Sequence, residues 1–125
     1  MATMKFSKEH EWIRVEGDVA TIGITQHAAE QLGDLVFVEL PEPGRELKAG
    51  EEICALESVK AVAYVYAPIT GTIAAVNESL RKAPELINQD PYGDGWILRI
   101  APSEPEQSVD LLDAAGYRGT LEAAD

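Results

Sequence analysis

The stretch ALESVKAVAY, Ala55–Tyr64, decides the fold because it joins two strand-like runs, ICALE before it and VAYVYAP after it. Two such runs separated by a few residues predict a β-hairpin. A tight connection of this kind usually contains Gly, Asn or Asp, which tolerate positive φ. Here the connection is Ser58-Val59-Lys60-Ala61, which contains none of the three. We therefore expect these residues to be read by another molecule, with Lys60 at the exposed apex of the hairpin.

Lys60 has a plain interpretation and a functional one. A lysine at a hairpin tip is normally a solvated surface side chain. The strand before the tip starts after Gly50, and the strand after it ends at Ala67-Pro68-Ile69-Thr70-Gly71, so two strands present one amine away from the body. An amine placed in this way is accessible to a modifying enzyme, and acylation would convert it into a tethered amide.

The remaining sequence predicts short strands separated by turns. The run EWIRVEGDVATIGI is typical of a hairpin that turns at Gly17, and a short helix near residues 26–32 follows it, with Thr25 as N-cap and Gly33 after its end. An irregular loop, ESLRKAPELINQDPYGDG, precedes the last strand. The other expected strands are DLVFVEL, EICALE, VAYVYA, TIAAVN and WILRI.

The C-terminal residues have a different character. Ser103-Glu104-Pro105-Glu106 fits a capping box with proline in the first turn, and a helical pattern follows. Residues 103–125 are therefore predicted to form a helical C-terminal extension packed on the body. Many short strands with two small helical pieces indicate a mostly-β barrel or sandwich, in a single domain over residues 1–125.

Composition and charge exclude several classes of protein. The net charge of −12 comes from 22 acids against 10 bases, and no basic run is longer than Arg81-Lys82, which argues against nucleic-acid binding. An acidic surface instead favours encounters with basic protein partners. No apolar stretch is long enough for a membrane span, so we expect a cytoplasmic protein.

The chain carries almost none of the residue patterns that enzymes use. It has no phosphate-binding glycine loop, no G-x-S-x-G motif, and only His10 and His27 as histidines, far apart in sequence, so a metal site is not expected. Cys54 is the single cysteine and lies in the apolar run Ile53–Leu56, which predicts a small buried hydrophobic residue.

The segment Glu57-Ser58-Val59-Lys60-Ala61 resembles the lipoylation sequence of the glycine cleavage system H protein family. This resemblance implies a biotinyl/lipoyl-attachment fold, a barrel-sandwich hybrid in which two sheets form a flattened β-barrel. It covers about residues 5 to 115, in the family's order. The other matching blocks are His10-Glu11-Trp12, Ala20–Thr25, Leu32-Gly33-Asp34, Phe37–Pro41, Pro84–Asn88, Asp90–Gly93 and Gly95-Trp96.

The resemblance implies that Lys60 carries lipoate and that the chain is a non-catalytic carrier. Its partners would be a pyridoxal-phosphate glycine decarboxylase, a tetrahydrofolate-dependent aminomethyltransferase and a dihydrolipoyl dehydrogenase, which load, unload and reoxidise the arm. A lipoyl ligase or octanoyltransferase would recognise Glu57, Ser58, Val59 and Ala61. A biotin carrier is the weaker alternative, because biotin carriers place methionines around the lysine.

The resemblance also implies that the loaded arm folds back into a surface cleft. Glu11 is the candidate partner for the charged amine, and the neighbouring Trp12 is the candidate cover for the arm. The alternative is a surface acid beside a core tryptophan. Relatives often carry a Ser-Asp pair where this chain has Ala63-Tyr64, so one plausible amine partner is missing.

Two other functions stay open from the sequence. A related carrier could serve other complexes or pass lipoate on, and a small hydrolase could act on the lipoyl adduct. Only the carriers would gain a lipoyl group, and glycine-exchange assays would separate the two kinds of carrier.

Overall fold

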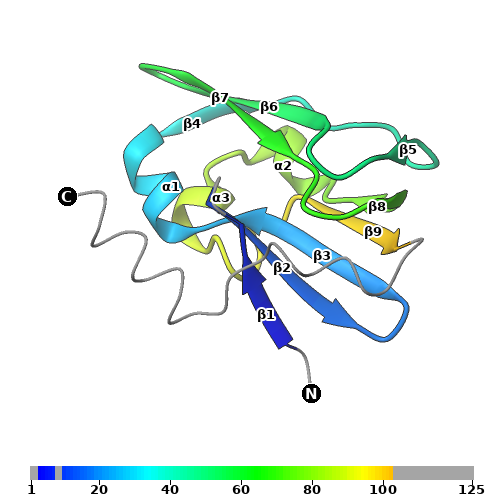
Figure 1. The fold of residues 1–125 in the computed structure, drawn as a ribbon. Helices are drawn as coiled ribbons and strands as arrows, with labels where there is room; N and C mark the ends of the chain where they lie inside the picture. Colours follow the sequence, from blue (N-terminus) through cyan, green and yellow to red (C-terminus); the bar gives the residue numbers. More distant parts are fainter. Residues whose placement is uncertain (1–2, 8–9, 103–125) are drawn as a thin grey trace.

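The computed structural model describes residues 3–7 and 10–102, which form two antiparallel sheets with three short helices (Figure 1). A six-stranded sheet has the order β1-β2-β3-β9-β8-β5, and a three-stranded sheet has the order β4-β6-β7. The strands are β1 (Thr3–Phe6), β2 (Glu11–Glu16), β3 (Val19–Ile24), β4 (Leu35–Val38), β5 (Glu46–Leu47), β6 (Glu52–Ser58), β7 (Val62–Tyr66), β8 (Gly71–Val76) and β9 (Leu98–Pro102). The helices are α1 (Gln26–Leu32), α2 (Ser79–Lys82) and α3 (Leu86–Gln89).

The two sheets enclose one principal core, and the predicted mostly-β fold is confirmed. Ile13, Ile22 and Ile100 of the six-stranded sheet and Leu56 and Val65 of the three-stranded sheet belong to one buried cluster. Burial of such side chains on facing sheets is the main force that holds a sandwich together. The three-stranded sheet therefore lies over the six-stranded one, and the β6–β7 hairpin projects beyond it (Figure 1).

The predicted β2–β3 hairpin and α1 helix are confirmed in detail. Glu16 pairs with Val19, and Gly17 takes a φ of 63° in the turn between them. At the start of α1, the Thr25 hydroxyl accepts a hydrogen bond from Ala28 N at 3.2 Å. At the end of α1, Gly33 has a φ of 81° and its N–H donates to Ala29 O of the helix.

Three regions differ from the prediction, and one of them is the two-residue strand β5, which was not expected and pairs with β8. Strand β1 was not expected, and it pairs with β2 along its whole length, with Phe6 opposite Trp12. The loop before β9, predicted to be irregular, contains the single-turn helices α2 and α3, each anchored by one fully buried side chain, Leu80 and Ile87. A single turn is too short to show helical periodicity in a sequence.

The predicted helical extension over residues 103–125 lies outside the described residues, so it and the single-domain assignment stay predictions. No helix within residues 3–7 and 10–102 is long and apolar enough to cross a membrane.

Candidate functional site

The turn between β6 and β7 is closed by a serine side chain. Ser58 N donates to Ala61 O at 2.8 Å, and the Ser58 hydroxyl donates to the same oxygen at 3.2 Å. That hydroxyl also accepts from Lys60 N at 3.2 Å and from Ala61 N at 3.0 Å. A hydroxyl offers one donor and two acceptor positions, so its capacity is fully used. Ser58 therefore supplies the hydrogen bonds of the turn.

The tip needs no glycine because none of its residues adopts a left-handed conformation. Among residues 3–7 and 10–102, His10 is the only non-glycine residue with positive φ. Ser58 is buried, whereas Val59, Lys60 and Ala61 are all exposed, Val59 to 72%. The amine of Lys60 thus lies on a projecting turn whose backbone is fixed by a buried side chain.

The tip is also held from outside the hairpin. Val59 N donates to Asp34 O, in the loop after α1, at 3.1 Å. A Cβ placed on Gly33 would lie 3.3 Å from Lys60 Cε, so the lysine stem passes close over this glycine. The loop after α1 therefore supports both the backbone and the side chain at the tip.

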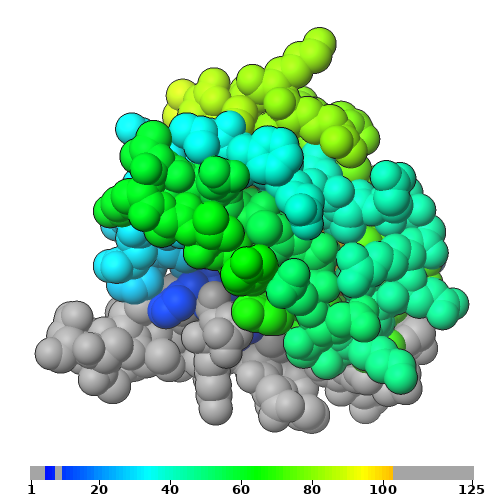
Figure 2. Space-filling view, turned by 90° about the horizontal axis from the view of Figure 1, so that it is seen from above, coloured from blue at the N-terminus to red at the C-terminus, as the bar shows by residue number. Residues whose placement is uncertain are grey.

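Exposed apolar side chains lie around Glu57 on the outer face of the three-stranded sheet. Glu57 pairs with Phe37 on one side and with Val62 on the other, so the three side chains share one face. Phe37 and Val62 are 55% and 53% exposed, and Glu57 is exposed as well. Figure 2 shows this face of the molecule from above. A partner that approaches Lys60 from this face also meets Glu57.

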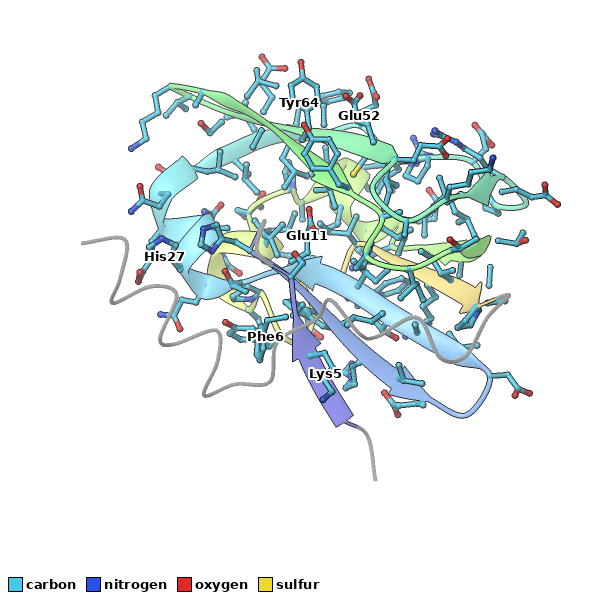
Figure 3. All side chains as sticks on the ribbon, viewed as in Figure 1. Lys5, Phe6, Glu11, His27, Glu52 and Tyr64 are labelled. Carbon is cyan, nitrogen blue, oxygen red and sulfur yellow. The ribbon has the colours of Figure 1, made fainter. Side chains whose placement is uncertain are left out.

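A cleft of about 310 Å³ lies beneath β7, beside α1. Its lining includes His10, Glu11, His27, Gln31, Leu56 and Tyr64. Figure 3 labels Glu11 and His27, which reach this region from β2 and α1, and Tyr64 on β7 above them. The wall of the cleft combines apolar surface, two imidazoles and one carboxylate.

Glu11 is a buried carboxylate, only 2% exposed, and not a surface acid. Its Oε1 accepts from the Ser7 hydroxyl at 2.8 Å, and its Oε2 accepts from Tyr66 N at 2.8 Å. Both carboxylate oxygens of Glu11 therefore accept hydrogen bonds from the chain, and these bonds fix the carboxylate at the wall of the cleft.

Trp12 lies away from the cleft, because successive residues of a strand point to opposite faces of the sheet. Its side chain is fully buried, its Nε1 donates to Pro91 O at 2.9 Å, and its ring packs near Tyr92 in a second, smaller core cluster. The structure therefore separates Trp12 from Glu11.

The contact between His10 and His27 could not be predicted from the sequence. Their ring centroids are 4.8 Å apart at the cleft, although His10 precedes β2 and His27 lies in α1. Cys54 is buried as expected, and burial raises the pKa of its thiol to about 12, with the nearby charges of Glu39, Glu11 and Glu52 adding to the effect. A thiol with this pKa stays protonated and unreactive at neutral pH.

Comparison with known proteins agrees with these features. A family model described as "Glycine cleavage H-protein" matches residues 4–124. The chain belongs to the glycine cleavage H-protein family. It is 58% identical to the glycine cleavage system H protein of Symbiobacterium thermophilum over 93% of the chain and 91% of the relative. It is 55% identical to that of Klebsiella pneumoniae over 97% and 95%.

A crystal structure of a glycine cleavage system H protein from Mycobacterium marinum also matches, with a TM-score of 0.87 and 39% identity over 95% of this chain and 96% of that one. The chain is thus the lipoyl-bearing aminomethyl carrier of the glycine cleavage system, and it is not an enzyme. Its partners are the glycine decarboxylase, the aminomethyltransferase and the dihydrolipoyl dehydrogenase.

Proposed function

We propose that Lys60 is the residue that carries the lipoyl group, through an amide at its Nζ. The observation that supports this most strongly is the exposed lysine on a projecting turn that Ser58 and the Asp34 carbonyl hold in place. The bound dithiolane supplies the transfer and redox chemistry, and the protein supplies position and reach. A lysine stem with an eight-carbon acyl chain spans roughly 13 Å, enough to enter a partner's active site while the carrier stays at the rim.

The residues around Lys60 divide into two groups by exposure. Glu57, Val59 and Ala61 are exposed and are proposed to be read by the lipoyl ligase or octanoyltransferase. Ser58 is buried and its hydroxyl is saturated within the turn, so its contribution to recognition is the shape of the tip.

Glu11 is proposed to hold the ammonium group of the carried aminomethyl unit inside the cleft. Its carboxylate lines the cleft, and burial strengthens a charged hydrogen bond there relative to one in water. The apolar part of the lining, which includes Leu56, is proposed to pack against the arm. Trp12 takes no part in this proposal, because its ring packs in the core.

A cytoplasmic location is the final part of the proposal. Bacterial relatives such as that of Klebsiella pneumoniae support it.

The experiment that tests the lipoyl site is the intact mass of the protein after expression with lipoate or treatment with lipoate ligase. Wild-type protein should gain one lipoyl group, and Lys60→Arg should gain none, because a guanidinium does not form the amide. Lys48→Arg and Lys82→Arg are matched controls that should be lipoylated like the wild type. Lipoylated Lys60→Arg protein would overturn the proposal.

A further inference from the structure

The side-chain amide of Asn88 holds the loop that supports the hairpin tip. Its Nδ2 donates to Gly33 O at 2.8 Å, and its Oδ1 accepts from Leu35 N at 3.0 Å. The two bonds therefore span Asp34 and fix the peptide groups on both sides of it. Asn88 belongs to α3, which packs against α1 and is anchored in the core by the fully buried Ile87 (Figure 1).

This loop depends on a side chain because it leaves α1 before regular strand pairing begins. Gly33 has positive φ at the helix end, and the pairing of β4 with β6 is irregular between Leu35 and Phe37. Buried or half-buried backbone groups in such a segment need partners from elsewhere. The carboxamide of Asn88 has the same donor and acceptor as a peptide group, so it takes the place of a neighbouring strand.

The same loop contacts the tip directly. Asp34 O accepts from Val59 N at 3.1 Å, and Gly33 lies under the stem of Lys60. A continuous path thus runs from α3 through Asn88 and the Asp34 peptide to the residue next to Lys60. Without Asn88, the acceptor of the Val59 N–H would no longer be fixed in space.

We propose that Asn88 is a positioning residue for Lys60, which sets the direction in which the lysine leaves the body without touching the arm itself. As far as lipoylation is concerned, this inference rests on the proposed role of Lys60. Its structural part, the support of the tip through Asp34, stands without any modification.

The chain offers a close control in Asn77. Its Nδ2 donates to Asp94 O at 2.9 Å and to Trp96 O at 2.8 Å, so it also ties two loop positions together through its amide. Neither loop position contacts the tip. Asn77 Oδ1 also accepts from Ser79 N at 3.3 Å, so Asn77→Ala removes three side-chain hydrogen bonds, against two for Asn88→Ala. It therefore reports the effect of a loss of stability that does not arise at the loop next to the tip.

The test begins with hydrogen exchange at the Val59 amide in the unmodified protein. Asn88→Ala should raise the exchange rate of the Val59 amide about tenfold relative to the exchange rate of the Leu56 amide in the same hairpin. The reason is that the hydrogen bond from Val59 N to Asp34 O opens more easily when the loop is not held. Asn88→Asp keeps an acceptor for Leu35 N but lacks the donor for Gly33 O, so it should show a smaller increase. Asn77→Ala should leave the ratio of Val59 to Leu56 exchange unchanged.

The second readout is kcat/KM of a lipoate ligase on the same proteins. It should fall severalfold for Asn88→Ala and stay near the wild-type value for Asn77→Ala. Unchanged Val59 exchange in both Asn88 variants, equal effects of Asn88→Ala and Asn77→Ala, or increased exchange with unchanged lipoylation would each overturn the proposal. If wild-type protein gains no lipoyl group at Lys60 while Val59 exchange responds as expected, the proposed lipoyl site fails and the support of the tip by Asn88 holds.

Discussion

The hairpins β2–β3 and β6–β7 are both antiparallel strand pairs, but their functional residues lie at different ends. In β6–β7 the proposed functional residue lies in the turn, and in β2–β3 it lies at the open end. The β2–β3 turn relies on Gly17 with a φ of 63°, and a Cβ there would meet nothing within 4 Å. The β6–β7 turn is held by hydrogen bonds to the Ser58 hydroxyl and by the bond that Val59 N donates to Asp34 O. The open end of β2–β3 instead carries Glu11 into the cleft. A turn that only connects strands needs backbone freedom, whereas a turn that presents a side chain needs support from outside.

The largest effect is expected at the presenting turn. Lys60→Arg should reduce glycine turnover in the reconstituted system to the level measured without the carrier, because no arm can be attached. The exposed position of Lys60 predicts a change in unfolding free energy of no more than about 0.5 kcal/mol. Gly17→Ala, in the connecting turn, should keep full turnover when it is folded. Turnover by Lys60→Arg above the carrier-free level would contradict the distinction between the two turns.

The next effect concerns the open end of β2–β3. Glu11→Gln should shorten the lifetime of the aminomethyl-loaded protein about tenfold, which corresponds to the loss of ~1.4 kcal/mol from one charged hydrogen bond. The measurement is the release of formaldehyde and ammonia from isolated loaded protein.

Glu16→Gln is the matched control, since Glu16 lies on the same strand but is exposed and paired with Arg14. Lipoylation and reoxidation by the dehydrogenase should be unaffected in both variants, because neither reaction involves the amine. Equal decay of Glu11→Gln and wild-type protein would show that other groups in the cleft hold the amine.

A smaller effect is expected when each turn loses the residue that shapes it. Both variants should lose stability, but only the variant in the β6–β7 turn should be lipoylated more slowly. Ser58→Ala removes the hydroxyl that bonds Lys60 N and Ala61 N, which should lower the unfolding free energy by ~1–2 kcal/mol and also slow lipoylation. Gly17→Ala should lower stability by a similar ~1–2 kcal/mol, through strain at positive φ, without changing the lipoylation rate. Urea unfolding and ligase kinetics measure both quantities. Unaltered lipoylation of Ser58→Ala would show that the tip needs no fixed shape.

The smallest change in stability is expected for Glu57→Gln, within about ±0.5 kcal/mol, together with slower lipoylation. Glu52→Gln is the control, because Glu52 is exposed on the same strand but lies at its far end from the tip. Equal ligase rates for the two variants would remove Glu57 from the recognition surface.

Local patterns predicted much of this molecule, and contacts between distant segments could not be predicted. The caps of α1, the Gly17 turn and the exposed Lys60 follow from residues close together in sequence. Trp12 and Glu11 are neighbours in the chain, which suggests a shared site, although strand alternation places their side chains on opposite faces of the sheet. The contact of His10 with His27 and the bonds of Asn88 to the loop after α1 depend on how the sheets and helices pack.

Peptide mapping of the lipoylated wild-type protein by mass spectrometry shows directly which lysine carries the lipoyl group. We predict that the lipoyl group lies on Lys60, in the peptide that contains the turn closed by Ser58, and on no other lysine. A lipoyl group on Lys48 or Lys82, with Lys60 unmodified, would contradict this prediction.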